Sequence, residues 1–300
     1  MDLSLSRIAD APKAIDAAFL NSPQFASNQL SERLGREVVV KVETLNPIGS
    51  FKGRGTSLLA RELDASRTWV CATAGNFGQG LAHAARERGA SAHVFVGDDA
   101  PAGKVERIRA LGAEVEVRDQ PELAAREHAE ADEGRLLVAD GSHPSIAEGA
   151  GTIAVEFQEA GPFDAVVVQL GDGALITGVA RWLKAEMPGA RVIGVCASGA
   201  PAMAQSFAAG RPIAVEGTGT IAGTLAITDP LPESLDRVLA LVDDVLLVDD
   251  DQMRSAMRLI ADATGVLVEP AGAAGVAALA RHGARLPAGR VGVILTGALQ

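Results

Sequence analysis

Short runs of β-branched and other apolar residues alternate with longer segments rich in Ala, Leu, Glu and Arg from about residue 36 onward. The short runs have the length and composition of buried strands, and the longer segments space their apolar residues as amphipathic helices do. Strands that alternate with helices in this way form parallel sheets covered by helices. The pattern therefore predicts the α/β fold class.

Turn residues separate the predicted elements. Helices are expected to end at Gly89 and Gly112, because glycine tolerates the left-handed conformation that closes a helix. The predicted strands are 38–42, 69–72, 93–96, 114–117, 135–138, 165–170, 191–196, 245–248 and 291–295. The predicted helices are 79–88, 104–111, 121–133, 175–186, 201–209, 252–263 and 271–281. Residues 210–242, rich in glycine and proline, are expected to form a long irregular segment with a functional or dimer-contact role.

One turn interrupts this alternation, which then begins again. It consists of Asp140-Gly141-Ser142-His143-Pro144, and most of these residues are common in turns. We therefore expect a domain boundary there.

Composition and charge narrow the classes of partner. The 300 residues are 48% hydrophobic but include only eight Phe, two Trp and no Tyr, which leaves few side chains for stacking on nucleic-acid bases. The 27 Lys and Arg residues against 38 Asp and Glu residues give a net charge of −11, which repels phosphate backbones and anionic membrane surfaces. We predict no nucleic-acid partner and no membrane partner.

The cysteines and the first residues favour a cytoplasmic protein. Cys71 and Cys196 each lie at the end of an apolar run and are expected to be small buried core residues, not a disulfide or a zinc site. The first residues, Met1-Asp2-Leu3-Ser4, lack the basic and apolar regions of a signal peptide. No run of 18 apolar residues is present.

The first candidate motif is Gly171-Asp172-Gly173-Ala174-Leu175, which follows an apolar strand and opens a helix. A small-residue turn in this position exposes backbone N–H groups and the positive end of the helix dipole, so it can bind a phosphate. A dinucleotide fingerprint would need glycine where Ile176 stands, and a P-loop would need Gly-Lys-Ser/Thr. An ordinary turn between a strand and a helix remains the alternative.

The second motif is Ser50-Phe51-Lys52-Gly53-Arg54-Gly55. A lysine between a bulky apolar residue and glycine, where a helix would begin, can be partly desolvated. Desolvation lowers the pKa of the amine and makes it a Schiff-base nucleophile. The alternative is a solvated surface lysine.

Three further turns carry polar groups. Thr73-Ala74-Gly75-Asn76 lies at the carboxyl end of a strand, where α/β sheets bind ligands, and its hydroxyl, amide and N–H groups could hold a carboxylate and a phenolic oxygen. It could equally be a local turn. Val268-Glu269-Pro270-Ala271-Gly272 and Leu295-Thr296-Gly297 each fit a simple helix-entry turn as well.

Taken in chain order, these segments resemble the fold-type II pyridoxal-phosphate (PLP) enzymes, in particular the serine/threonine dehydratase branch. The resemblance extends from about residue 5 to 297 and is carried by residues 41–43, 49–55, 72–80, 148–153, 171–175 and 268–275. It implies two open, twisted, mostly parallel sheets with flanking helices and PLP in the cleft between two domains. The large domain would comprise residues 1–66 and 146–300, and a small mobile domain residues 67–145.

The resemblance also implies roles for matching residues. Lys52 would hold PLP as a Schiff base and move the substrate's α-proton, and Asn76 would bond the cofactor's ring oxygen. The phosphate would be bound by Gly171, Asp172, Gly173, Ala174 and Leu175. The substrate would be bound by Ser50, Thr73, Ala74, Gly75, Asn76 and Phe77. Thr296 would meet the pyridine nitrogen, and an uncharged hydroxyl there favours prompt β-elimination.

Two departures from the family pattern change the expected activity. Family members that racemise serine carry a second serine where Ala74 stands, and a methyl group cannot carry a proton, so we predict little racemase activity. Some relatives bind a divalent cation through acidic residues where this chain has Gly219 and Gly223. Hard cations need oxygen ligands, so we predict no metal site.

Other departures concern the cofactor and substrate pockets. Asp172 and Ala174 interrupt a loop that is usually all glycine, and a carboxylate beside a phosphate is unfavourable unless it points outward. Thr296-Gly297-Ala298-Leu299 looks slightly more like the ending of threonine synthase. Phe77 stands where a histidine is often found, so it would reshape the substrate pocket or act in packing.

The resemblance implies a cytoplasmic, homodimeric PLP-dependent lyase of amino-acid metabolism. It would remove water from a small L-threonine- or L-serine-type substrate and release a 2-oxo acid and ammonia. The alternatives are β-replacement, as in cysteine synthase, the chemistry of threonine synthase, and a PLP-binding protein without catalysis.

Overall fold

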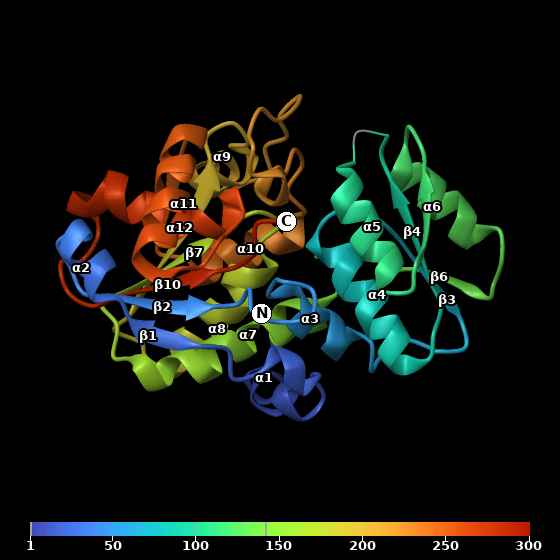
Figure 1. The fold of residues 1–300 in the computed structure, drawn as a ribbon, viewed down its shortest axis with the longest axis horizontal. Coiled ribbons are helices and arrows are strands. Elements are labelled where there is room, and N and C mark those ends of the chain that lie inside the picture. The colour runs from blue at the N-terminus through green and yellow to red at the C-terminus, as the bar shows by residue number, and fades with distance from the viewer. Residues whose placement is uncertain (1, 99, 142) are drawn as a thin grey trace.

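Two sheets form the framework of the protein (Figure 1). The computed structural model describes residues 2–98, 100–141 and 143–300. The larger sheet has the strand order β1 (Gln24–Ala26), β2 (Val38–Val42), β10 (Val291–Leu295), β7 (Ala165–Gln169), β8 (Arg191–Ala197) and β9 (Asp244–Val248). The smaller sheet has the order β5 (Glu114–Val117), β4 (Ala92–Val96), β3 (Thr68–Ala72) and β6 (Arg135–Leu137). Neighbouring strands are parallel except β1 and β2, so the predicted α/β class is confirmed.

The larger sheet joins both ends of the chain, with β2 (blue) beside β10 (red) in Figure 1. Alternate residues of a strand face opposite sides of a sheet, so Val38 and Val40 pack on one face and Val39 on the other. The first face is covered by α2 (Asn28–Leu34), α11 (Asp250–Thr264) and α12 (Pro270–His282). The second is covered by α7 (Pro144–Phe157), α8 (Ala174–Glu186) and α10 (Pro232–Leu241), with a contact from α9 (Ala202–Ala209). Burial on both faces explains why these strands are continuous apolar runs.

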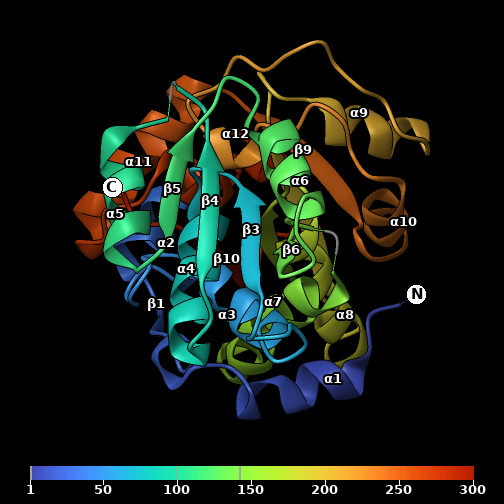
Figure 2. The same ribbon diagram turned by 90° about the vertical axis from the view of Figure 1, so that its right-hand side faces the viewer.

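The smaller sheet is built from the middle of the chain, and Figure 2 shows its strands side by side. One face packs on α3 (Lys52–Leu59), α4 (Asn76–Arg88) and α5 (Ala102–Ala110). The other face packs on α6 (Pro121–Glu130) through Val70, Phe95 and Ala125. The division into domains 67–145 and 1–66 with 146–300 stays a prediction. Ser142, in the turn where we placed the boundary, lies outside the described residues.

The segment 210–242 is not irregular throughout, because it contains α10 and a 3-10 turn, Gly223–Leu225. Pro232 is the first residue of α10, where its fixed φ and missing N–H suit a helix start. Leu235, Val238 and Leu241 follow at helical spacing and are buried. The prolines and glycines in this segment led us to predict an irregular structure, although residues 232–241 have an amphipathic helical pattern.

Among the other α-helices and strands of the described residues, α1 (Leu5–Asp10), α2, α7 and the edge strand β1 were not predicted, and for α3 only the start near Lys52 was expected. The helix α4 also begins at Asn76 instead of residue 79. The polar end of the third motif therefore forms the first turn of a helix. This places the positive end of the α4 dipole at the motif.

Close helix packing fixes the starts of α3 and α8 relative to each other. A Cβ atom on Gly178 of α8 would lie 1.9 Å from the carbonyl oxygen of Ala147 in α7. A Cβ atom on Gly149 would lie 2.7 Å from the carbonyl oxygen of Arg54 in α3. Backbones approach this closely only where glycine leaves room. Helix α7 therefore holds α3, which begins at Lys52, close to α8, which begins in the 171–175 motif.

A buried ionic network ties α3 to the larger sheet. The Arg54 guanidinium is fully buried, with Nε 2.8 Å from Glu43 Oε2 and Nη1 2.6 Å from Glu156 Oε1. The Lys41 ammonium on β2 lies 2.6 Å from Glu156 Oε2. Burial opposes the charge of Glu156, but its hydrogen bonds to Arg54 and Lys41 outweigh it and lower its pKa to about 2. Every charge in the network has an opposite charge in contact, as buried ions require.

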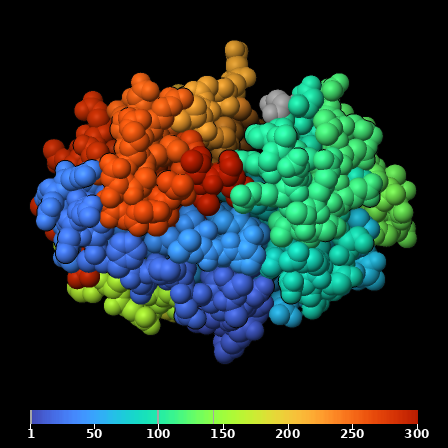
Figure 3. Space-filling model, viewed as in Figure 1, coloured from blue at the N-terminus to red at the C-terminus, as the bar shows by residue number. Residues whose placement is uncertain are grey.

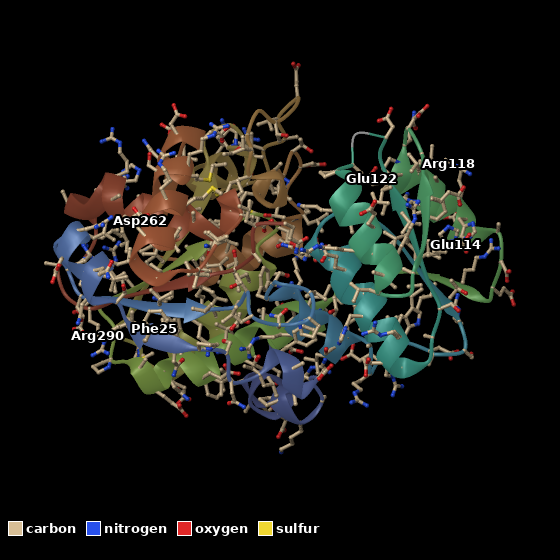
Figure 4. The ribbon with its side chains drawn as sticks, in the orientation of Figure 1. Phe25, Glu114, Arg118, Glu122, Asp262 and Arg290 are labelled. Carbon is tan, nitrogen blue, oxygen red and sulfur yellow. The ribbon has the colours of Figure 1, made fainter. Side chains whose placement is uncertain are left out.

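The C-terminal residues contact the middle segment of the chain at the junction between the sheets. Figure 3 shows the C-terminal residues (red) against the middle segment (green), where Gln79 Nε2 donates to Gln300 Oε1 at 2.8 Å. Figure 4 labels Glu114 and Arg118 on the far flank of the smaller sheet and Arg290 on that of the larger one. Within the described residues, no helix is long and apolar enough to cross a membrane.

Candidate active site

A cavity of about 460 Å³ lies at the carboxyl ends of the strands, between the two sheets. Strands β3, β7 and β10 lead directly into it, which is where open α/β sheets bind ligands. Most predicted site residues line it, namely Lys52, Thr73, Ala74, Gly75, Asn76, Phe77, Gly171, Asp172, Gly173, Leu175 and Thr296. Segments more than 200 residues apart in sequence therefore meet at one site.

Two predicted residues do not line the cavity. Ser50 is fully buried behind it, and its side-chain oxygen accepts a hydrogen bond of 3.2 Å from the backbone N–H of Lys52. Ala174 lies in the phosphate-type turn, but its side chain is directed into the core. Ser50 thus supports the start of α3, and Ala174 offers a backbone donor only.

Lys52 is the first residue of α3, and its amine faces two carboxylates. Its Nζ lies 2.8 and 2.7 Å from the Asp140 oxygens and 3.2 Å from Asp172 Oδ2. Burial lowers the pKa of the Lys52 amine, but the two carboxylate charges outweigh burial and raise it above its usual range. The predicted lowering of this pKa is therefore wrong, because sequence reasoning saw the apolar neighbours and not the two carboxylates.

Asp172 points into the site and not outward. Its Oδ1 accepts a hydrogen bond of 2.9 Å from the Ala174 N–H, and its Oδ2 faces Lys52. Gly173 has a φ of +99°, which lets the chain turn into α8 at this point. Burial opposes ionisation of Asp172, but the Lys52 charge and the Ala174 N–H outweigh it and lower the pKa of this carboxyl.

The pKa of Asp140 shifts in the opposite direction to that of Asp172. Burial and the negative charge of Asp172 raise its pKa to about 6, although Lys52 acts against both. Asp140 belongs to the turn that we interpreted only as a domain boundary. Asp140 and Lys52 are 88 positions apart in the sequence, so no local pattern indicated that they are in contact.

Asn76 and Glu269 form a second wall of the cavity. Asn76 Nδ2 donates to Glu269 Oε1 at 2.9 Å, and the Thr224 hydroxyl donates to the same oxygen at 3.3 Å. The Lys104 ammonium lies 3.9 Å from Glu269 Oε2. Burial raises the pKa of Glu269 in spite of these neighbours.

Sequence reasoning missed several residues of this wall. The fourth motif contained Glu269 but gave it no role, and no pattern singled out Lys104. Gln169 also lines the cavity, and its Nε2 donates to the carbonyl oxygens of Gly272 and Ile294 at 3.1 and 2.8 Å. It therefore helps hold β7 beside β10 and α12.

The groups around the cavity fit a phosphorylated aldehyde cofactor. The Lys52 amine can bond an aldehyde, and the turn before α8 offers N–H groups and a helix N-terminus to a phosphate. Asn76 Oδ1 is buried without a hydrogen-bond partner among the described residues, so a ligand's polar group can satisfy it. The inward carboxylate of Asp172 opposes a phosphate, and Asp140 places a second carboxylate in the same cavity. The fold and site together define a PLP-type enzyme.

The comparisons with known proteins lead to the same class. The chain belongs to the pyridoxal-phosphate dependent enzyme family, which matches residues 15–297. It is 34% identical to a putative threonine dehydratase of Sinorhizobium fredii, covering 99% of this chain and 92% of that protein. It is 34% identical to a phenylserine dehydratase of Ralstonia pickettii, covering 98% and 92%. The structure of maize serine racemase is similar with a TM-score of 0.90 and 30% identity, covering 99% and 94%.

These findings confirm the predicted family, the fold of two mostly parallel sheets, the PLP cofactor and an enzyme related to the dehydratases. The relatives have different substrates and reactions in their names, so they agree on the cofactor chemistry and not on one substrate.

Proposed function

We propose that this protein is a PLP-dependent ammonia-lyase that removes water from a small L-hydroxyamino acid of the threonine or serine type. The products would be a 2-oxo acid and ammonia. One observation supports this proposal most directly: the Lys52 amine lines the same cavity as two turns at helix N-termini, 171–175 and 73–77. Dehydratases are among the relatives at 34% identity over nearly the whole chain.

PLP, when bound, supplies an electron-withdrawing ring that makes the α-proton of the amino acid acidic. Lys52 would hold the cofactor through its amine, be displaced by the substrate's amine and then take the α-proton at Nζ. The N–H groups of the 171–175 turn would bind the phosphate. The Thr296 hydroxyl would meet the ring nitrogen without giving it a full proton, which favours loss of the leaving group over reprotonation.

The substrate side of the cavity is formed by the start of α4. The Thr73 hydroxyl, the N–H groups of residues 74–77 and the α4 dipole would hold the substrate carboxylate. Phe77 would border the side-chain pocket. Once the hydroxyl has left as water, the released enamine hydrolyses to the 2-oxo acid and ammonia. Closure of the mobile domain 67–145 would exclude bulk water during this step.

The first test is 2-oxo acid release from L-threonine and L-serine by the cofactor-loaded protein. Lys52→Ala should abolish release, and Lys13→Ala, a matched change at an exposed lysine, should not. Release that persists in Lys52→Ala would overturn the assignment of Lys52. No release from either substrate, together with a change in the visible spectrum, would favour β-replacement and lead to assays with added sulfide.

The homodimer and the cytoplasmic location remain part of the proposal. Light scattering on the purified holoenzyme tests the dimer directly, and a monomer would contradict it.

A further inference from the structure

Asp140 makes the closest polar contacts with the lysine amine. Both of its carboxylate oxygens lie within 2.8 Å of Lys52 Nζ, whereas Asp172 offers one oxygen at 3.2 Å. Asp140 reaches the site from the turn between β6 and α7, and Asp172 from the turn between β7 and α8. The amine is thus held by two neighbouring turns, since a Cβ atom on Gly141 would lie 3.7 Å from the Cβ atom of Asp172.

The other charged or titratable groups around this pair come from three elements. Cys71 on β3 lies near Asp140, and burial raises the pKa of its thiol to about 12, so it stays neutral. Lys104 on α5 and Glu269 at the start of α12 line the same cavity and face each other. Between the two carboxylates in contact with Lys52, burial and like charge favour a proton on Asp140, and the Ala174 N–H favours the charged form of Asp172.

This arrangement raises a chemical problem for the lysine. Two carboxylates stabilise Lys52 as an ammonium, which has no lone pair and cannot attack an aldehyde. One proton must leave Nζ before a covalent bond can form. The acceptor has to lie within hydrogen-bond distance and must hold the proton more readily than its neighbour does.

We propose that Asp140 is the acid–base partner of Lys52 and accepts this proton during capture of the cofactor. The ammonium of Lys52 gives one proton to Asp140 and becomes an amine. The amine nitrogen then forms a double bond to the aldehyde carbon, and the aldehyde oxygen leaves as water with the two remaining protons. Asp140 later returns its proton to solvent. This inference rests on the proposed role of Lys52.

The test measures covalent capture of the cofactor and needs no substrate. Apoprotein is mixed with PLP, and the visible absorbance of the covalently bound cofactor is followed in time for wild type, Asp140→Asn and Asp172→Asn. Either substitution removes one negative charge beside Lys52 and so lowers the pKa of its amine, which by itself speeds capture about tenfold per pKa unit. We expect this acceleration for Asp172→Asn, and for Asp140→Asn a rate about 100-fold below wild type, because the acceptor is lost.

The two substitutions are therefore expected to change the rate of PLP capture in opposite directions. If Asp140→Asn also captures PLP faster than wild type, Asp140 acts through its charge alone and the proposal is overturned. Circular dichroism shows whether both variants are folded, and Asp140→Glu should recover part of the lost rate.

A pH series on wild type keeps the proposal testable if Asp140→Asn does not fold. Capture should depend little on pH above about 6 and slow below it, where Asp140 is already protonated and cannot accept, whereas the free-amine fraction of Lys52 rises tenfold per pH unit on both sides of pH 6. A capture rate that follows only the free-amine fraction of Lys52 would contradict the proposal. Lys52→Ala separates this inference from the function itself, because covalent absorbance in that variant would show that another lysine holds the cofactor.

Discussion

The carboxylate of Asp172 accepts a hydrogen bond of 2.9 Å from the backbone N–H of Ala174, inside the turn that opens α8. That N–H is one of the donors expected to bind the cofactor phosphate. An anion from the chain itself therefore uses a donor that the phosphate needs. The phosphate would have to displace this carboxylate or lie beside it, and both cost binding free energy.

Replacing Asp172 with glycine should tighten PLP binding. The change removes a like charge and frees the Ala174 donor, and a hydrogen bond to a charged group is worth about 1.5–3 kcal/mol, or roughly 10- to 100-fold in Kd. Absorbance titration of the apoprotein with PLP measures the effect. Asp251→Gly, at a fully exposed position, serves as the control. Weaker binding by Asp172→Gly would show that the carboxylate assists the cofactor.

A serine at position 74 should introduce racemisation. Ala74 lines the cavity, and its methyl group cannot carry a proton to or from the substrate. We expect little D-serine from L-serine in wild type and a clear gain in Ala74→Ser, measured by chiral chromatography. Ala131→Ser, on the exposed surface, should change nothing. Free racemisation by the wild type would contradict the argument, which matters because a serine racemase is among the similar structures.

Removal of divalent cations should leave the activity unchanged. Gly219 and Gly223 are exposed and offer no side-chain oxygen where some relatives carry acidic residues. In the part of the chain that the structure describes, no group of three or more His, Cys, Asp or Glu residues is placed to hold a metal. Dialysis against a chelator tests the prediction. Activity that is lost and then restored by magnesium would refute it.

Local patterns predicted the strands well. The bounds of β2, β5 and β10 match the prediction, because each is an apolar or alternating run enclosed by turn residues. Local signals failed at two helix starts, Pro232 of α10 and Gly75 before α4, although the start of α6 at Pro121 was predicted correctly. At Pro232 the local preference agreed with the helix, but the surrounding glycines and prolines obscured the pattern. The start of α4 was placed three residues too late because Gly75-Asn76 also fits a local turn.

The candidate site was predictable as a set of motifs and not as a network of charges. Lys52, the two turns and Thr296 meet at one cavity, as their place at strand ends implies. The contact between Lys52 and Asp140 depends on the tertiary fold alone, and so does the contact between Asn76 and Glu269. The predicted direction of the Lys52 pKa shift was wrong because the sequence did not show this contact with Asp140.

Glu156 should contribute strongly to stability at neutral pH and lose that contribution in acid. Its pKa lies at about 2 in the folded protein and near 4.5 when unfolded, so the unfolded chain binds its proton first as the pH falls. The stabilisation is complete above about pH 4.5 and disappears towards about pH 2. The shift corresponds to about 3 kcal/mol.

Glu156→Gln removes this charge and leaves the buried Lys41 and part of Arg54 without their partner. We expect the free energy of unfolding at pH 7 to fall by about 3–5 kcal/mol, since breaking a buried ion pair leaves an uncompensated charge. The difference between variant and wild type should shrink as the pH falls, because acid removes the same charge from the wild type. Urea unfolding at a series of pH values measures both effects, with exposed Glu159→Gln as the control. A difference that stays constant down to low pH would show that Glu156 acts through packing and not through its charge.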